Sequence, residues 1–459
     1  MPMNKFTSIC RLATLALLAG VASCVVHPPG EREERAAALQ LGKPFEKRIE
    51  VRQIQSLPEN PTPDQLVEYA LLSNAELEQH YWEWRSAIEQ IPQDGTQITT
   101  LNVSAGTSIT HGRTSWGSST LALSNDPMTD IHWPGKLDAA AKQTLENARA
   151  TGHRFIKAKY DLRNKVLSAY YDYALNAELI RLEQSNQQLL QTTAMVTEAR
   201  NRAGTSGQQE VLKASNEVDM SGNDIANMES QLPSQRAMIN ALLSRPSDAL
   251  LPVPKDLPPV RTLFYGDEEL VELAAKQNPE LIALADEIRA QGHGIRLAKL
   301  QYVPDFNLSV GTDLLGVTQS LLGQATIPML RYEALNAAIA QAEAKLRASE
   351  AMRRQAGNDL TAQVVADMTI IRDADRQLDL FEHTIFPRAR HAVDVGRSAY
   401  ESGQASLLDL LDSQRSLIAI ERLISKLRIT QETHLAELES ITASDLTSLP
   451  HTDPRAAAQ

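Results

Sequence analysis

Leu66-Val-Glu-Tyr-Ala-Leu-Leu-Ser-Asn-Ala-Glu-Leu77 recurs further along the chain as Leu270-Val-Glu-Leu-Ala-Ala-Lys-Gln-Asn-Pro-Glu-Leu281, with seven identities in twelve positions at a shift of 204 residues. Three further pairs of segments repeat in the same order at shifts between 194 and 205: 101–106 with 306–311, 134–150 with 328–344, and 204–218 with 403–417. Four matches in one order at nearly one spacing predict a tandem duplication of one structural unit. We therefore expect two repeats, at 64–245 and 267–442, joined by a Pro-rich linker at 246–266.

Each repeat has the same predicted order of elements. A short helix is followed by two strands, at about 99–125 in the first repeat and 305–327 in the second, because apolar and polar residues alternate there with a period of two. Long helical stretches follow, at about 136–244 and 331–442. Outside the repeats, we expect an extended N-terminal arm at 24–63 and a disordered tail at 443–459. The fold class is mainly α with a small β portion.

The helical stretch of each repeat is expected to fold back on itself, pairing 136–200 with 208–244 and 331–399 with 406–442. Glycines occur at both reversals, where a tight turn needs a permissive backbone: Gly204, Gly207 and Gly403. Apolar side chains at a seven-residue spacing predict one packing seam in each repeat. The two seams are Leu175, Leu182, Leu189 and Val196, and then Val364, Ile371, Leu378, Ile385, Ala392 and Ala399. Pro387 interrupts the second seam and should kink or break that helix.

The N-terminus has the features of an export signal. Residues 1–23 contain a short positive segment and an apolar stretch too brief to span a bilayer. Small residues precede Cys24, as in a bacterial lipobox, which predicts a lipid on Cys24 as the first mature residue and an outer-membrane address. Two alternatives remain at this point: an ordinary signal with an incidental cysteine, and an N-terminus that is retained.

Composition excludes several classes of function. The formal net charge is −12, the wrong sign for a protein that neutralises nucleic-acid phosphates. Aromatic residues make up only 5% of the chain, which suits helix packing through small residues. The sequence contains no Walker loop, no Gly-x-Ser-x-Gly and no paired His/Cys cluster. It therefore predicts no enzyme, no metal site and no cofactor beyond the covalent lipid.

The predicted strands imply an oligomer if they enter a membrane. Four strands cannot close a barrel, and open edges in lipid leave backbone groups without hydrogen bonds. Two copies would supply eight strands, which fill their own interior, whereas three copies would supply twelve and leave a lumen. For a protein that passes cargo, we expect a trimer.

One stretch is typical of a known family. It runs from Phe386 to Leu417 and reads Phe386-Pro-Arg-Ala-Arg-His-Ala-Val-Asp-Val-Gly-Arg-Ser-Ala-Tyr-Glu-Ser-Gly-Gln-Ala-Ser-Leu-Leu-Asp-Leu-Leu-Asp-Ser-Gln-Arg-Ser-Leu417. This stretch resembles the second helical hairpin of TolC-type outer-membrane efflux proteins. Asn278-Pro-Glu-Leu281 and Ile327-Pro-Met-Leu330 are also similar to segments of that family. The resemblance covers about 64–442. It implies a homotrimer whose twelve-stranded β-barrel in the Gram-negative outer membrane continues into a periplasmic α-helical barrel.

The resemblance also implies partners and site residues. A periplasmic adaptor would dock on the hairpin tips and link the duct to an inner-membrane pump, for which we expect the RND type. Asp409 and Asp412 resemble acidic residues that line the periplasmic entrance, and crowding of their charges should raise some of their pKa values. Tyr400 resembles a residue that links neighbouring hairpins, with Glu210 as its acceptor. The alternative function is a lipid-anchored periplasmic coiled-coil protein, structural or an adaptor.

Overall fold

The computed structural model describes residues 26–52, 54–96, 101–110, 113–124, 133–261, 263, 265–313, 319–326 and 331–446. The predicted signal at 1–23, Cys24 and most of the predicted tail lie outside the described residues. The chain divides into two compact units. The first takes in Met1–Lys43, Tyr81–Arg154 and Ile282–Gln355, and the second takes in Pro44–His80, Phe155–Leu281 and Ala356–Gln459. Each unit draws on both sequence repeats, so the repeats are not two separate domains.

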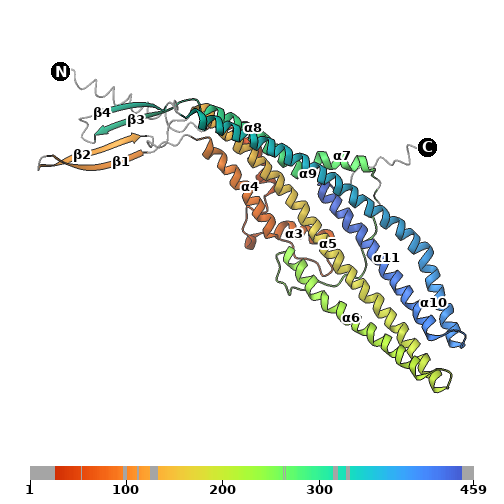
Figure 1. Ribbon diagram of the computed structural model, residues 1–459. Helices are drawn as coiled ribbons and strands as arrows, with labels where there is room; N and C mark the ends of the chain where they lie inside the picture. Colours follow the sequence, from red (N-terminus) through yellow and green to blue (C-terminus); the bar gives the residue numbers. More distant parts are fainter. Residues whose placement is uncertain are drawn as a thin grey trace. The chain divides into compact units, whose positions relative to one another are not determined.

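The first unit contains a four-stranded antiparallel sheet with strand order β1-β2-β3-β4. The strands are β1 (Leu101–Thr110), β2 (Arg113–Ser124), β3 (Asp305–Asp313) and β4 (Gln319–Thr326), as Figure 1 shows. Pairing of β2 with β3, from Thr120 opposite Asp313 to Ser124 opposite Ser309, joins the hairpin of one repeat to that of the other. Within the described sheet, β1 and β4 each have one strand neighbour. The sheet is therefore open at both edges.

The helices of the first unit pack through small residues against a few aromatic rings. They are α2 (Glu31–Leu41), most of α4 (Ala75–Asp94) and α8 (Pro279–Leu300), and the N-terminal parts of α5 (Pro134–Arg202) and α9 (Tyr332–Leu380). A Cβ atom at Gly152 would lie 2.7 Å from the Trp84 ring, so α5 needs a glycine where it meets that side chain. The Trp84 indole also donates a 2.8 Å hydrogen bond to Glu34.

The prediction of an extended N-terminal arm was wrong for the residues that form α2. Three acidic residues, Glu31, Glu33 and Glu34, lie in its first turn and are favoured there by the helix dipole. Ala36, Ala37 and Ala38 follow, and alanine has the highest intrinsic helix propensity. The segment is too short and too polar to show a clear apolar period, so its helix was not predicted.

The second unit consists of helices. It contains α3 (Pro63–Ser73), α6 (Gln208–Leu242), α7 (Asp267–Gln277), α10 (Phe386–Glu401), α11 (Leu407–Thr442), and the C-terminal parts of α5 and α9. Figure 1 shows α6 folded back beside α5 and α11 beside α10. One part of its core joins α7, α9 and α11 through buried apolar residues that include Leu270, Met368 and Leu438. No helix among the described residues has both the length and the apolar character needed to cross a membrane.

The repeated asparagines have the same role in both copies. Asn74 accepts a 2.9 Å hydrogen bond from the Leu77 amide at the start of α4 and donates a 2.9 Å bond to the Leu242 carbonyl at the end of α6. Asn278 accepts a 3.0 Å bond from Leu281 and donates a 2.9 Å bond to the carbonyl of Ile441, near the end of α11. Each side chain therefore satisfies one helix start and one helix end, which explains why asparagine recurs at this place.

Arg261 anchors the C-terminal part of the linker at 246–266 to the helices. Arg261 binds Glu432 through its side chain and its backbone N–H, both at 2.7 Å, and binds Glu439 at 2.9 Å. Glu439 also contacts Arg163 of α5 at 2.5 Å. Glu432 and Glu439 are buried. The two arginines compensate their charges, as burial of ionised groups requires.

Pro387 does not break the second long helix. The residues before it, Phe381–Ile385, form a π-helical turn, in which the amide of Phe386 donates to the carbonyl of Phe381. A π turn accommodates one residue more than an α-helical turn, so the packing face moves by one residue. Before the turn the buried seam contains Val364, Ile371 and Leu378, and after it the buried residues are Val393 and Tyr400.

The predicted continuation of the seam to Ala392 and Ala399 was therefore wrong: Ala392 is exposed and Ala399 is half-buried. In the first repeat, the predicted seam from Leu175 to Val196 is only half-buried. The buried positions lie one residue further on, at Asn176, Glu183, Leu190 and Thr197. The seven-residue period was right in both repeats, but it gave the wrong face in the first.

Candidate functional site

The two hairpin tips in the second unit share one backbone design. Gly204 has φ 74° and Gly403 has φ 76°, in the left-handed region. The next residue after each glycine bonds back five positions, Thr205 to the Arg200 carbonyl at 2.9 Å and Gln404 to the Ala399 carbonyl at 2.8 Å. This is the Schellman arrangement that ends a helix. A Cβ atom at either glycine would have no close contact, so φ rather than space selects glycine.

Gly207 has a different role from the one predicted. Its φ of −84° and ψ of 154° describe extended backbone, and it is the N-cap of α6. The equivalent residue of the second repeat is Ser406, the N-cap of α11. The prediction that the turns need the permissive backbone of glycine is therefore confirmed for Gly204 and Gly403, which have positive φ, and not for Gly207.

The N-caps of the two tips differ in chemistry. Ser406 and Asp409 form a capping box: the Asp409 amide donates to Ser406 Oγ at 3.3 Å, and the Ser406 amide donates to Asp409 Oδ2 at 3.2 Å. The Ser406 hydroxyl also donates to Asp409 Oδ2 at 2.7 Å. In the first repeat, Glu210 occupies the position equivalent to Asp409, but Gly207 has no side chain with which to complete the box.

Asp409 and Asp412 are exposed and lie three residues apart on one face of α11. Neither carboxylate has a basic partner among the described residues. Hydrogen bonds from the Ser406 hydroxyl and amide lower the pKa of Asp409 from its ordinary value. Within one chain, this is the opposite of the rise expected from charge crowding, because the carboxylate closes the capping box. The crowding between chains remains a prediction.

Tyr400 is buried between the hairpins. Its hydroxyl donates a 2.9 Å hydrogen bond to Thr197 Oγ1 on α5. The guanidinium of Arg200 lies over the ring, 4.4 Å from its centroid, and donates to the Tyr400 carbonyl. The predicted acceptor, Glu210, is therefore not the partner within this chain, because the tyrosine hydroxyl donates to α5 instead. A contact between chains remains a prediction.

Further polar bonds join α5 to α11 below the tips. Gln414 donates to Thr193 Oγ1 at 3.0 Å, and both side chains are buried. Glu183 is also buried and accepts hydrogen bonds from Ser221 at 2.6 Å and from Arg422. Burial alone would raise the pKa of Glu183, but the bonds from Ser221 and Asn186 and the charge of Arg422 outweigh burial and lower it.

The sequence analysis missed these partners: Thr193, Thr197, Arg200, Gln414, Glu183 and Arg422. One signal was available for Glu183 and Thr197, because they lie on the same seven-residue spacing as Leu190. The predicted seam was placed on the apolar residues one position earlier, so neither Glu183 nor Thr197 was assigned to it. A buried polar seam can be recognised only when the opposing helix and its donors are known.

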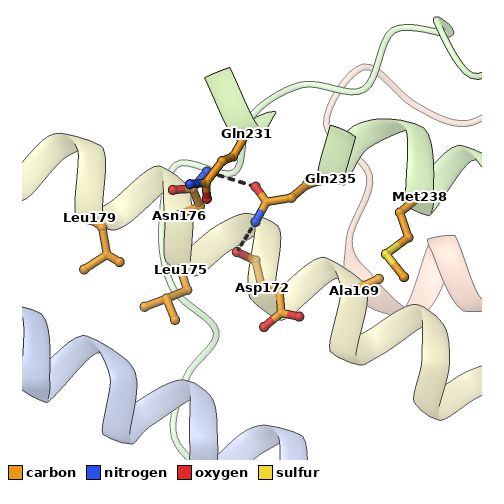
Figure 2. A pocket seen from close by; sticks show the side chains of 8 residues that line it. All are labelled: Ala169, Asp172, Leu175, Asn176, Leu179, Gln231, Gln235 and Met238. Carbon is orange, nitrogen blue, oxygen red and sulfur yellow. Dashed lines mark hydrogen bonds between the residues drawn. The ribbon is translucent and has the colours of Figure 1, made fainter. Parts of the chain in front are cut away.

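Two grooves lie beside these contacts. The first, of about 250 Å³, lies between α5 and α6. Asn176 donates a 2.9 Å hydrogen bond to Gln235 in its lining, and Figure 2 draws this bond as a dashed line. It is lined by Ala169, Asp172, Leu175, Asn176, Leu179, Gln231, Gln235 and Met238. The second, of about 320 Å³, lies between α5 and α11 and includes Gln414 and Glu421. Asparagine and glutamine amides and apolar side chains recur in both linings.

Comparison with known proteins identifies the fold and the family. The profile of the outer membrane efflux protein family matches residues 66–245 and 270–444, which are the two repeats. The pyoverdine export outer membrane protein OpmQ of Pseudomonas putida is 22% identical over 318 residues, covering 66% of this chain and 66% of that protein. Its counterpart in Pseudomonas aeruginosa is 22% identical over 308 residues, covering 65% and 64%. The matches thus span just under two thirds of these relatives.

Solved structures of outer-membrane channels have the same fold. The structure of CusC superposes with a TM-score of 0.74 at 17% identity, covering 83% of this chain and 92% of CusC. The outer membrane protein VceC from Vibrio cholerae gives a TM-score of 0.73 at 17% identity, covering 84% and 96%. Because the family profile covers both repeats, with their strands and helical hairpins, the chain belongs to the outer membrane efflux protein family.

Proposed function

We propose that this protein is the exit duct of a tripartite efflux or secretion system and works as a homotrimer. The observation that carries the proposal is the open sheet: β1 and β4 have one described neighbour each. An open edge inside lipid leaves unpaired backbone groups at a cost of several kcal/mol each. Pairing of β1 of one copy with β4 of the next removes every edge, and three copies make a twelve-stranded barrel with a lumen.

The helical hairpins supply the periplasmic portion of the proposed duct. In a trimer, the hairpins α5–α6 and α10–α11 of three copies form a helical barrel, and their tips are the docking place for a periplasmic adaptor. The adaptor links the duct to an inner-membrane pump, of the RND type in our proposal. The buried bonds of Tyr400 and Arg200 hold the two tips of one chain together, which supports a tip that acts as one body.

The proposed pore constriction is formed by Asp409 and Asp412. Both are exposed on α11 and lack basic partners among the described residues. Three copies would place six carboxylates around one axis, and such rings favour cations over anions. Glu210 and Tyr400 are proposed to contact the neighbouring chain at the closed entrance, in addition to the bonds that Tyr400 makes within its own chain.

The alternative, a lipid-anchored periplasmic coiled-coil protein, accounts for the helices but gives no role to the sheet, which joins both repeats. Purification of the full chain from membranes in detergent, followed by crosslinking and planar-bilayer recording, separates the two functions. The duct predicts a crosslinked trimer and discrete conductance steps. A monomer that leaves the membrane with a salt wash and gives no conductance would support the alternative.

We also propose that the duct is anchored in the outer membrane by a lipid on Cys24. The proposal rests on the small residues that precede Cys24 in the sequence. Metabolic labelling with radioactive palmitate should mark the wild-type chain and not Cys24→Ala. Equal labelling of both would refute the lipid anchor while leaving the duct intact.

A further inference from the structure

Three potential metal ligands meet in the second unit although they are distant in sequence. Asp367 lies on α9, and His434 and Glu437 lie one turn apart on α11. His434 Nδ1 is 2.8 Å from Asp367 Oδ1 and 3.7 Å from Glu437 Oε2. One ligand atom from each of the three residues lies within 4.8 Å of the other two. The cluster therefore presents one imidazole nitrogen and two carboxylates to a common point.

The Asp367 carboxylate has a free oxygen. Its side chain is 6% exposed, and its Oδ2 atom has no hydrogen-bond partner among the described residues. A buried carboxylate oxygen without a donor is unfavourable, since it has lost its water. His434 occupies Oδ1 only. The second oxygen, Oδ2, can therefore bind a cation, and no described protein group provides one.

The surroundings fix the ligands in place. Gln363 Nε2 donates a 2.6 Å hydrogen bond to Glu437 Oε1, which leaves Glu437 Oε2 directed toward His434. Buried apolar residues flank the cluster on both helices: Val364 and Met368 on α9, and Leu435 and Leu438 on α11. Outer hydrogen bonds and an apolar shell of this kind orient metal ligands and strengthen their attraction for a cation.

We propose that Asp367, His434 and Glu437 bind a borderline divalent transition-metal ion of the Zn²⁺ class. Ligand atoms about 2.0–2.2 Å from a tetrahedral ion lie roughly 3.3–3.6 Å from one another. The separations of 2.8 Å and 3.7 Å around His434 Nδ1 bracket that range, so small side-chain rotations suffice. One imidazole with two carboxylates suits Zn²⁺; Ca²⁺ and Mg²⁺ prefer oxygen ligands alone, and Cu⁺ prefers sulfur.

The bound ion ties α9 to α11. Because the three ligands come from both helices, binding to the folded chain alone raises its thermal stability by mass action. His434 and Glu437 are 25% and 33% exposed, which leaves a route for the ion and for a water as fourth ligand. This metal site does not depend on the duct function. Sequence spacing could not show the site, because Asp367 lies 67 residues from His434.

The test uses the full-length protein in detergent, freed of metal with a chelator and titrated with ZnCl₂ in a calorimeter. We expect one ion per chain, with a rise in thermal midpoint. His434→Gln should weaken Zn²⁺ binding by about a hundredfold or more, since loss of an outer-shell partner alone costs roughly 10–100-fold. Co²⁺ should give visible d–d absorption in the wild type and lose it in the variant.

His383→Gln is the matched control. His383 Nδ1 lies 3.4 Å from Asp379 Oδ1, but both side chains are mostly exposed and neither belongs to the three-ligand cluster. The His383→Gln variant should bind Zn²⁺ with the affinity of the wild type and should give the same visible absorption with Co²⁺. Glu437→Gln replaces a partly exposed side chain and guards against a misfolded His434 variant; it should also weaken binding. Absence of stoichiometric binding, or equal affinity in the wild type, His434→Gln and Glu437→Gln, would overturn the proposal.

Discussion

Asn74 and Asn278 show how much one side chain can contribute to a fold made of long helices. A helix end has four backbone groups without partners in the helix, and each asparagine satisfies one amide and one carbonyl in different helices. Both side chains are buried, so water cannot replace the lost bonds. The tandem duplication has thus kept a residue that links the short helices α3 and α7 to the ends of the hairpins.

Asn278→Ala should lower the free energy of unfolding by about 2–4 kcal/mol, the sum of a lost N-cap and an unsatisfied buried carbonyl. Asn278→Ser keeps an acceptor for the Leu281 amide but cannot reach Ile441. Its free energy of unfolding should therefore fall by less than that of Asn278→Ala. Denaturant unfolding of the detergent-solubilised chain measures both losses. Equal losses for Ala and Ser would show that the capping bond contributes nothing.

Asp409→Ala combined with Asp412→Ala should reduce the preference of the proposed channel for cations, because it removes six carboxylates from a trimer. The measurement is the reversal potential across a planar bilayer in a salt gradient. Asp379→Ala is the control, since this carboxylate is 85% exposed but lies outside the hairpin tips. Unchanged selectivity in the double variant would place the constriction elsewhere.

At the residue scale, the sequence predicted backbone roles better than side-chain partners. Gly204 and Gly403 were identified because positive φ leaves few choices of residue. The hydrogen-bond partner of Tyr400 was not identified, because the position of the tyrosine in the chain does not say whether α5 or α6 supplies the acceptor. Thr197 and Arg200 carry no motif, and their role follows only from the packing of α5 against α10.

At the scale of elements, the π turn at Phe381–Ile385 sets which face of α10 is buried. A helix with an unbroken seven-residue repeat would bury Ala392 and Ala399. The added residue leaves Ala392 exposed and Ala399 half-buried, and brings Val393 and Tyr400 inward. The contacts of Tyr400 at the tip therefore depend on a backbone feature that ends at Ile385, fifteen residues before the tyrosine.

Single-cysteine variants test this register directly. Ala392→Cys should react with a maleimide about tenfold faster than Val393→Cys, because only the second side chain must be uncovered by local opening. The comparison is between neighbours in one helix, so differences in expression or detergent cancel. Leu378→Cys, before the π turn, should be as protected as Val393→Cys. The reverse order at 392 and 393 would mean that the seam continues without a shift.

The pairing of Glu183 with Arg422 and Ser221 predicts a pH dependence for the contact between the hairpins. The pKa of Glu183 is lowered in the folded chain, so its stabilisation is present above its unfolded pKa of about 4.3 and is lost as the pH falls through the folded value. Glu183→Gln should therefore cost about 1–3 kcal/mol at neutral pH and less in acid. Thermal midpoints of both proteins at neutral and acidic pH measure this.

Asp375→Asn provides a comparison of opposite sign. Burial raises the pKa of Asp375, although a hydrogen bond from Gln431 opposes the rise. The contribution of Asp375 to folding stability is present below its unfolded pKa of about 3.9 and is lost as the pH rises through its folded pKa. In acid, the thermal midpoint of the wild type should therefore rise relative to that of Asp375→Asn. Over the same pH range, the amount by which it exceeds the midpoint of Glu183→Gln should become smaller. Parallel pH profiles for the two variants would contradict the assignment.

At the scale of the whole molecule, the duplication was predictable but the division into compact units was not. The repeats appear in the sequence because each preserves its own order of strands and helices. The units arise instead from contacts across the repeats, such as β2 with β3 and Arg163 with Glu439. Such contacts join residues that are far apart in the chain, and no local period reports them.

Closure of the sheet by identical copies makes a prediction about disulfides. In one chain, β1 and β4 are separated by β2 and β3, so their Cα atoms are about 14 Å apart, at three strand spacings. A disulfide tolerates no more than about 7 Å. A chain with Ser104→Cys in β1 and a second cysteine in β4, placed in turn at Ser320 and Gln324, can therefore form its strand-to-strand disulfide only with another copy.

If β1 of each copy pairs with β4 of the next, oxidation in membranes should give dimers and trimers on a non-reducing gel, and the series should stop at three because the ring is then closed. Each single-cysteine variant should give no species beyond a dimer, which also controls for Cys24. A series that continues past three chains would indicate an open assembly. Monomers that acquire an intramolecular disulfide would show that one chain closes its own sheet, and the trimeric duct would then have no structural basis.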